Sequence, residues 1–117
     1  MSMEADLFTM LKAICPRTYP DFAPTSTVRP YVTFQKIGGK AINYTDGVIP
    51  TERNVDVQIN VWSDTRLQAD ALIAQIEDAM RAATAFTARP NAAPMTDFDA
   101  DMQVYSCLQD YSIWASK

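Results

Sequence analysis

The sequence predicts one α+β domain over residues 1–117, with an antiparallel or mixed sheet of three to four strands and two helices packed on one face. Three observations support this prediction. Residues 54–62 alternate aliphatic and polar side chains with the period of two of a half-solvated strand. An alanine-rich helical pattern follows directly, and a second alternating stretch covers residues 102–114. With 48% apolar and 21% charged residues, the composition is that of a globular domain with one hydrophobic core.

The first expected element is a short amphipathic helix over Glu4–Ile14, whose apolar residues recur at helical spacing and whose N-cap is Ser2. Pro16 ends this helix, because the residue before a proline resists the α conformation. Residues 17–30 contain three prolines and are expected to connect the helix to the sheet without regular structure.

The first expected strand is Tyr31–Ile37, which is rich in β-branched and aromatic residues and is followed by two glycines. Residues 38–53 then form a polar loop that is long for a hairpin. Loops of this length in compact domains are often functional or mobile. The loop is therefore a candidate contact region.

In the strand at residues 54–62, alternation places Val57 and its aliphatic neighbours on one face and Trp62 on the opposite face. Tryptophan on an otherwise polar face has two interpretations. It is an anchor for a partner, since tryptophan is enriched at binding hot spots, or it is covered by a loop or by a cross-strand partner such as Trp114. The sequence leaves both open.

A helix is expected over Thr65–Ala83, capped by Ser63 and Asp64. Its predicted buried stripe is Leu72, Ile73, Ile76, Ala79, Met80 and Ala83. A weak strand over Phe86–Arg89 follows, then a loop or edge passage at residues 91–96. An acidic cluster precedes the last expected strand, Met102–Trp114.

The acidic cluster consists of Asp97, Asp99 and Asp101, whose spacing is shared by calcium-binding loops. The glycine and the bidentate glutamate that complete such a loop do not follow, so a solvated acidic loop is the preferred interpretation. The sequence contains no histidine and two distant cysteines, Cys15 and Cys107. Both cysteines are expected to be buried free thiols, and no metal or cofactor is expected.

The charge balance excludes further classes of function. A formal net charge of −4 with scattered basic residues argues against binding of nucleic acid by the free monomer. No apolar stretch approaches the length of about 20 residues that crosses a bilayer, and residues 1–14 carry acidic rather than basic residues, so no membrane span or signal peptide is expected.

Three segments together resemble a known family. They are Pro30-Tyr31-Val32-Thr33-Phe34-Gln35, then Asp56-Val57-Gln58-Ile59-Asn60-Val61-Trp62-Ser63 with the alanine-rich helix after it, and Tyr105 to Trp114. With Tyr19-Pro20 before the first strand, they are similar to the tail-completion, or head–tail joining, proteins of long-tailed bacteriophages and prophages. The resemblance covers nearly the whole chain and is weakest over residues 88–102.

The resemblance implies a structural protein without catalytic residues or cofactors. Such proteins cap the tail tube at its head-proximal end and join it to the head connector, so tail-tube and connector proteins are the expected partners. They are expected to act as rings, commonly of six subunits, and many are monomeric before assembly. The implied locations are the bacterial cytoplasm during assembly and then the virion.

Two other classes of function remain as alternatives. One is a ligand-binding or regulatory α+β domain of the host. Such a domain requires an apolar pocket with converging polar groups. The other is an enzyme that uses carboxylates alone, for which a surface acidic loop offers no enclosing cleft. For the preferred role, we expect the loops at residues 38–53 and 90–101 to make the contacts between subunits. The candidate contact residues are Lys40, Asn43, Tyr44, Asp46, Trp62, Asp97, Asp99 and Asp101.

Overall fold

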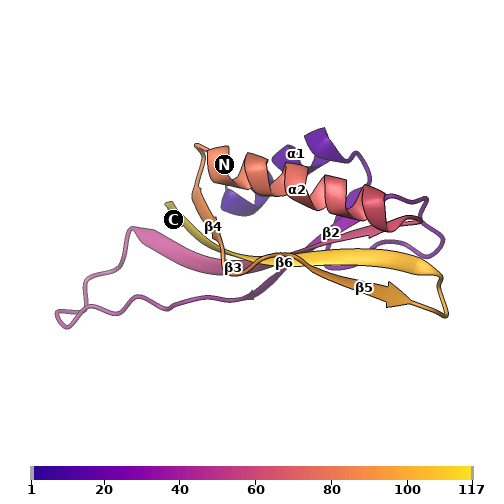
Figure 1. Cartoon of the computed structure of the whole chain (residues 1–117). Helices are drawn as coiled ribbons and strands as arrows, with labels where there is room; N and C mark the ends of the chain where they lie inside the picture. The colour runs from indigo at the N-terminus through magenta and orange to yellow at the C-terminus, as the bar shows by residue number, and fades with distance from the viewer. Residues whose placement is uncertain (1, 117) are drawn as a thin grey trace.

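The computed structural model describes residues 2–116, in which two helices lie on one side of a six-stranded mixed sheet (Figure 1). The helices are α1 (Met3–Ile14) and α2 (Arg66–Ala82). The strands are β1 (Thr18–Pro20), β2 (Tyr31–Gly38), β3 (Glu52–Ser63), β4 (Thr87–Pro90), β5 (Met95–Asp99) and β6 (Val104–Ser116). The α+β class with both helices on one face is confirmed, whereas the prediction of three to four strands is wrong.

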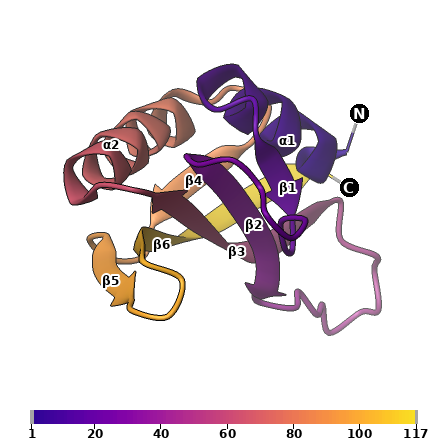
Figure 2. The ribbon, with the colours of Figure 1, turned by 90° about the vertical axis from the view of Figure 1, so that its right-hand side faces the viewer.

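The sheet has the order β1-β2-β3-β6, and the outer side of β6 pairs with two strands in succession. β4 pairs with the C-terminal half of β6 and β5 with its N-terminal half, so both form the same edge of the sheet. All pairs are antiparallel except β1 with β2, which makes the sheet mixed. Figure 2 shows the two helices side by side over this sheet.

Strand β1 lies in the segment that the sequence predicts to be irregular. It is only three residues long and ends in proline, so it carries no periodic signal. Its position is fixed by neighbours: the Thr18 hydroxyl donates to the Cys15 carbonyl at 2.6 Å, and the amides of Val32 and Asp21 bond across to the carbonyls of Arg17 and Phe34. Long-range pairing therefore creates this strand.

The secondary structure of the acidic cluster was also predicted incorrectly, as a loop. Asp97 and Asp99 lie in strand β5, and only Asp101 lies in the turn before β6. All five residues of β5 are exposed, so neither face is buried and no alternation of apolar residues marks the strand. Aspartate is also depleted in strands. The pairing of β5 with β6, from Met95 opposite Leu108 onward, forms the strand nonetheless.

The hydrophobic core lies between the helices and the sheet. The predicted aliphatic face of β3 is confirmed, since Val57, Ile59 and Val61 are at most 1% exposed. From α2, Ile73, Ile76 and Met80 are buried as predicted, and Ala69 joins them, while Leu72 and Ala83 are partly buried against the core. We call this side of the sheet the helix face; within residues 2–116 the opposite side, the open face, carries no helix.

The N-cap of α1 was predicted correctly and that of α2 was not. Ser2 caps α1 as expected, its hydroxyl accepting from the Ala5 amide at 3.1 Å. The cap of α2 is Thr65, not the Ser63-Asp64 pair, and its hydroxyl accepts from the Gln68 amide at 3.2 Å. The Ser63 hydroxyl instead donates to the Gln68 side chain at 2.6 Å, so it supports the same turn from outside the helix.

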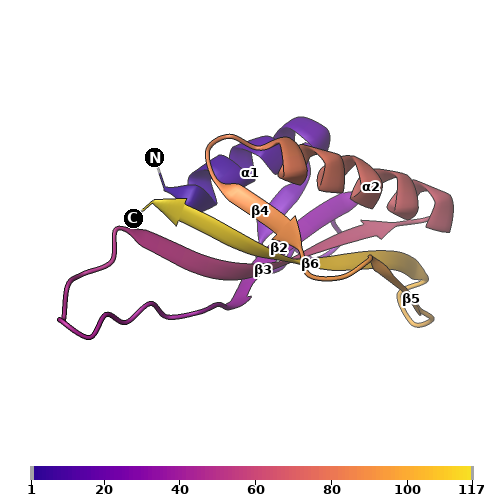
Figure 3. The same ribbon diagram turned by 60° about the vertical axis from the view of Figure 1, so that its left-hand side comes forward.

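The molecule is elongated, with extents of 53 × 25 × 24 Å. The long β2–β3 connection, residues 39–51, projects from one end, and we call it the arm (Figures 1 and 3). The loop is shorter than predicted because β3 begins at Glu52. The turn between β5 and β6 lies at the other end, and we call residues 97–103 the hairpin tip. The chain therefore presents two different exposed segments at its two ends.

Candidate functional site

The arm contains four of the predicted contact residues, Lys40, Asn43, Tyr44 and Asp46, and all four are exposed. Few contacts hold the arm in place. At its base, the Lys40 amide donates to Asn54 Oδ1 at 2.8 Å. At its end, the Val48 and Gly47 amides donate to Asp46 Oδ1 and to the Tyr44 carbonyl at 3.1 Å each.

The arm also exposes apolar side chains. Tyr44, Val48 and Ile49 are 54%, 57% and 74% exposed, and none of the residues of the arm belongs to the hydrophobic core. Apolar groups gathered on a projecting segment commonly mark a surface that another protein covers. The arm therefore adds nothing to the hydrophobic core and leaves its apolar side chains exposed.

The hairpin tip holds the other predicted acidic residues. Asp99 uses its carboxylate locally, since Asp99 Oδ1 accepts from the amides of Asp101 and Met102 at 3.0 and 3.1 Å. This pattern is typical of an aspartate that fixes a turn. In the part of the chain that the structure describes, no group of three or more metal-ligating side chains converges. Asp99 thus fixes the turn before β6, and the three aspartates are exposed and give the tip a negative surface.

Arg29 holds the hairpin tip against the rest of the domain. Its guanidinium donates to Asp64 Oδ1 and to the Gln103 carbonyl at 2.9 Å each, and to the Met102 carbonyl at 2.8 Å. The side chain of Arg29 is 23% exposed. Charge-assisted hydrogen bonds of this kind are stronger than neutral ones. The tip is therefore anchored at its C-terminal side by one residue from the β1–β2 connection.

Replacing Arg29 with alanine is expected to release the hairpin tip while β6 stays paired. The free energy of unfolding should fall by about 1–2 kcal/mol, because three partly solvated hydrogen bonds are lost. Amide hydrogen exchange should speed up selectively at residues 101–103. Arg66→Ala is the matched control, since Arg66 makes only a 4.0 Å ion pair. Unchanged amide exchange at the hairpin tip would show that the hydrogen bonds of Arg29 are not needed to hold it.

Trp62 lies on the open face, as predicted, and contacts its own chain there. Its ring stacks on Tyr31 with centroids 6.0 Å apart, and its Nε1 donates to Thr33 Oγ1 at 3.1 Å. The cross-strand partner is thus Tyr31. Trp114 is not that partner, because it pairs with Asn54 and with Thr87.

The structure does not bring the eight predicted residues into one site. Trp62 pairs with Ser106, which pairs with Asp97, so these residues form one row across the sheet near the hairpin tip. The four residues of the arm lie at the opposite end of the molecule (Figure 3). The candidates therefore divide into two surfaces.

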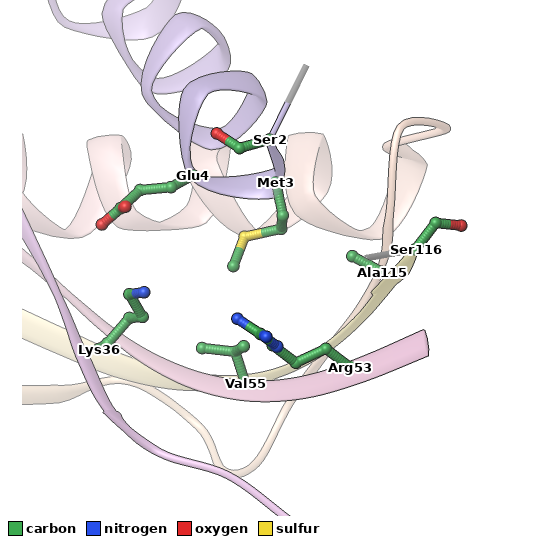
Figure 4. A pocket seen from close by; sticks show the side chains of 8 residues that line it. All are labelled: Ser2, Met3, Glu4, Lys36, Arg53, Val55, Ala115 and Ser116. Atoms are coloured by element: carbon green, nitrogen blue, oxygen red, sulfur yellow. The ribbon is translucent and has the colours of Figure 1, made fainter. Parts of the chain in front are cut away.

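A pocket at the base of the arm was not predicted. It has a volume of about 390 Å³ and lies between the N-terminus of α1 and the ends of β2, β3 and β6 at that end of the sheet (Figure 4). Lys36 and Arg53 contribute its positive charge. In the sequence, Lys36 lies within a predicted strand and Arg53 within a predicted loop, and only the register of the sheet places them around one cavity.

Both cysteines are free and buried, as predicted. Burial raises the pKa of the Cys107 thiol to about 11, and the nearby Asp70 carboxylate adds to the shift. The thiol donates to Asp70 Oδ1 at 3.7 Å. A thiol with a raised pKa is a poor nucleophile at neutral pH, so Cys107 is a packing residue. Among the described residues, neither helix has the length and apolarity that a membrane span requires.

Comparison with known families decides the class of the protein. The family described as "Tail completion protein gp17" matches residues 4–116, which is nearly the whole chain. The chain belongs to this phage tail completion family. No curated protein sequence matched the chain.

The match confirms the family predicted from the sequence. This tail completion protein is accordingly a structural protein of phage tail assembly and a component of the virion. The family is not usually enzymatic, and its role requires contacts with other proteins of the phage particle.

Proposed function

We propose that this tail completion protein closes the tail tube at its head-proximal end and joins the tube to the head connector as a ring of identical subunits. The observation that carries the proposal is the placement of the arm and the hairpin tip at opposite ends of a 53 Å long molecule. A ring requires a heterologous contact, in which one surface of each subunit meets a different surface of the next. Two dissimilar end surfaces on one chain meet that requirement.

The two surfaces also allow contacts along the tail axis. A ring of six, as the family resemblance implies, would leave part of each arm free to reach the tail tube or the connector. In this proposal Lys40, Asn43, Tyr44 and Asp46 contact neighbouring proteins through the arm. The acidic residues of the hairpin tip contact the next subunit, while Trp62 supports the tip's end of the sheet. Assembly takes place in the bacterial cytoplasm.

Shortening the arm should abolish assembly without unfolding the subunit. We expect a variant in which Gly-Ser-Gly replaces residues 43–48 to keep its melting temperature within a few degrees, because the arm adds nothing to the core. Light scattering should report a folded monomer, and negative-stain imaging should show cognate tail tubes with bare ends. The segment at residues 90–101 is unsuited to the same experiment, because it includes strand β5.

The unaltered protein provides the reference for this experiment. It should appear as a ring on one end of each cognate tail tube. Decoration that is unaffected by arm shortening would remove the arm from the interface. A wild-type protein that never decorates tubes would refute the capping role.

A further inference from the structure

The pocket at the base of the arm combines apolar walls with positive charge. Met3 approaches from α1, and Val55 and Ala115 from the sheet, as Figure 4 shows. Lys36 and Arg53 extend into the cavity from the sheet side, and Glu4 is the single carboxylate among the lining residues. The volume of about 390 Å³ accommodates one large side chain with its neighbours.

Among the described residues, the two cations of the pocket have no ionic partner. The ion pairs within residues 2–116 use Arg29, Arg66 and Arg81, and none involves Lys36 or Arg53. A pocket that combines apolar walls with two cations fits a ligand of the opposite pattern, with an apolar group near carboxylates.

The hairpin tip has that opposite pattern. Phe98 and Met102 are 46% and 58% exposed, and they alternate with three aspartates. Asp97, Asp99 and Asp101 form no ion pair within the described residues. The tip therefore presents large apolar side chains that are flanked by negative charge.

Resting on the ring proposed above, we propose that the hairpin tip of one copy docks into this pocket of the next copy, with its aspartates facing Lys36 and Arg53. The pocket lies beside the C-terminal end of β6 and the tip beside its N-terminal end, so the two cannot meet within one chain. Each subunit then offers one tip and one pocket, which is the arrangement that propagates a head-to-tail ring. The arm, whose base adjoins the pocket, would contact the neighbour beside the docked tip.

Site-directed cross-linking tests this contact directly. The variant R53C/D101C, assembled on cognate tail tubes and treated with a short bismaleimide, should yield a ladder of covalent oligomers up to the full ring. The two native cysteines are buried and react little. A cross-link between positions 53 and 101 is necessarily intermolecular because these positions lie at opposite ends. D78C/D101C is the control, since Asp78 lies exposed on α2, and it should give no ladder.

Charge reversal tests the chemistry of the same contact. R53E and D101K should each raise the concentration that half-saturates the tube ends by about tenfold or more, because like charges then face each other. The double variant R53E/D101K should return to within about threefold of the wild type, because the exchanged charges attract again. R89E and D78K, which reverse exposed charges elsewhere, should change binding little. Circular dichroism verifies that each variant is folded.

The outcomes separate this proposal from the one on which it rests. Decorated tube ends without a 53–101 cross-link, or without rescue in R53E/D101K, would overturn the docking of the tip while leaving the capping role intact. Wild-type protein that does not decorate tubes would refute the capping role and the docking with it. A ladder together with rescue would establish the interface.

Discussion

Replacing Gln109 with alanine is expected to lower the free energy of unfolding by about 3 kcal/mol, from lost hydrogen bonds and a new cavity. Gln109 is 1% exposed and lies on the helix face of β6. Its Nε2 donates to Glu77 Oε1 at 2.7 Å and to the Ala92 carbonyl at 2.9 Å, and its Oε1 accepts from the Tyr111 hydroxyl at 2.8 Å. The Gln109 side chain thus joins α2, the segment that connects β4 to β5, and β6.

The cost arises mainly from the partners left behind. Tyr111 is fully buried, so its hydroxyl would lose its acceptor in a region that water does not reach. The backbone at Ala92 would also lose the contact that holds the four residues between β4 and β5 against the sheet. Urea denaturation at pH 7, followed by circular dichroism, measures the change in free energy.

Tyr111→Phe is the matched control, because it removes only one hydrogen bond from this network. It should cost about 1 kcal/mol, and the combined variant Gln109→Leu with Tyr111→Phe should cost less than the sum of the two single changes. A cost for Gln109→Ala no greater than that of Tyr111→Phe would show that the network contributes no more than one ordinary hydrogen bond.

The difference in free energy of unfolding between the wild type and Gln109→Ala should also depend on pH. The hydrogen bond from Gln109 is the main cause of the lowered pKa of Glu77, whose ordinary value is 4.5, and Arg81 adds to the shift. A carboxyl whose pKa is lowered by folding stabilises the protein above its unfolded pKa and loses that contribution as the pH falls through its folded pKa. The gap between the wild type and Gln109→Ala should therefore narrow as the pH is lowered below about 4.5.

The elements predicted correctly are those whose burial repeats along the chain. Strand β3 and helix α2 each bury one face against the core, and burial of one face produces the periods of two and 3.6 that a sequence shows. The free, buried state of the cysteines follows from similar local reasoning. The family resemblance was carried by the same elements, and the match over residues 4–116 confirms it.

The elements predicted incorrectly depend on contacts between distant segments. β1 exists because β2 offers it hydrogen bonds, and β5 exists because β6 extends beyond β4. β1 is three residues long, too short to show a pattern, and β5 has no buried face and carries aspartates that disfavour a strand. Sheet register divides the candidate contact residues between two ends of the molecule and places Lys36 and Arg53 around one pocket. Local sequence patterns do not show either arrangement.

Replacing Gly39 with alanine is expected to detach the base of the arm, at a cost of about 3 kcal/mol from backbone strain and steric overlap. Gly39 has a φ of +139°, which side chains rarely tolerate, and an added Cβ would lie 2.5 Å from the Asn54 carbonyl oxygen. The second close atom is Val55 Cα at 3.0 Å. Both atoms belong to the backbone of β3, so no side chain can rotate away to relieve the overlap. The chain must therefore move the arm.

Movement of the arm would break the contacts of Asn54, a buried residue at the start of β3. Asn54 Oδ1 accepts from the Lys40 amide, while its Nδ2 donates to the Ser112 hydroxyl and the Ile113 carbonyl at 3.0 and 3.1 Å. This side chain thus ties the arm to β6. Amide exchange at residues 40 and 54–57 should accelerate in Gly39→Ala, and binding to tail tubes should fall with it.

Gly47→Ala separates strain from overlap, because Gly47 has a φ of +77° with no atom within 4 Å of the added Cβ. This variant should cost about 1 kcal/mol, the usual penalty of a left-handed residue, and should leave the base of the arm protected. If Gly39→Ala loses tube binding while Gly47→Ala retains it, the orientation of the arm at its base is what assembly requires. Equal binding by both variants would mean that the arm engages its partner without a fixed orientation, as a flexible segment that orders on contact.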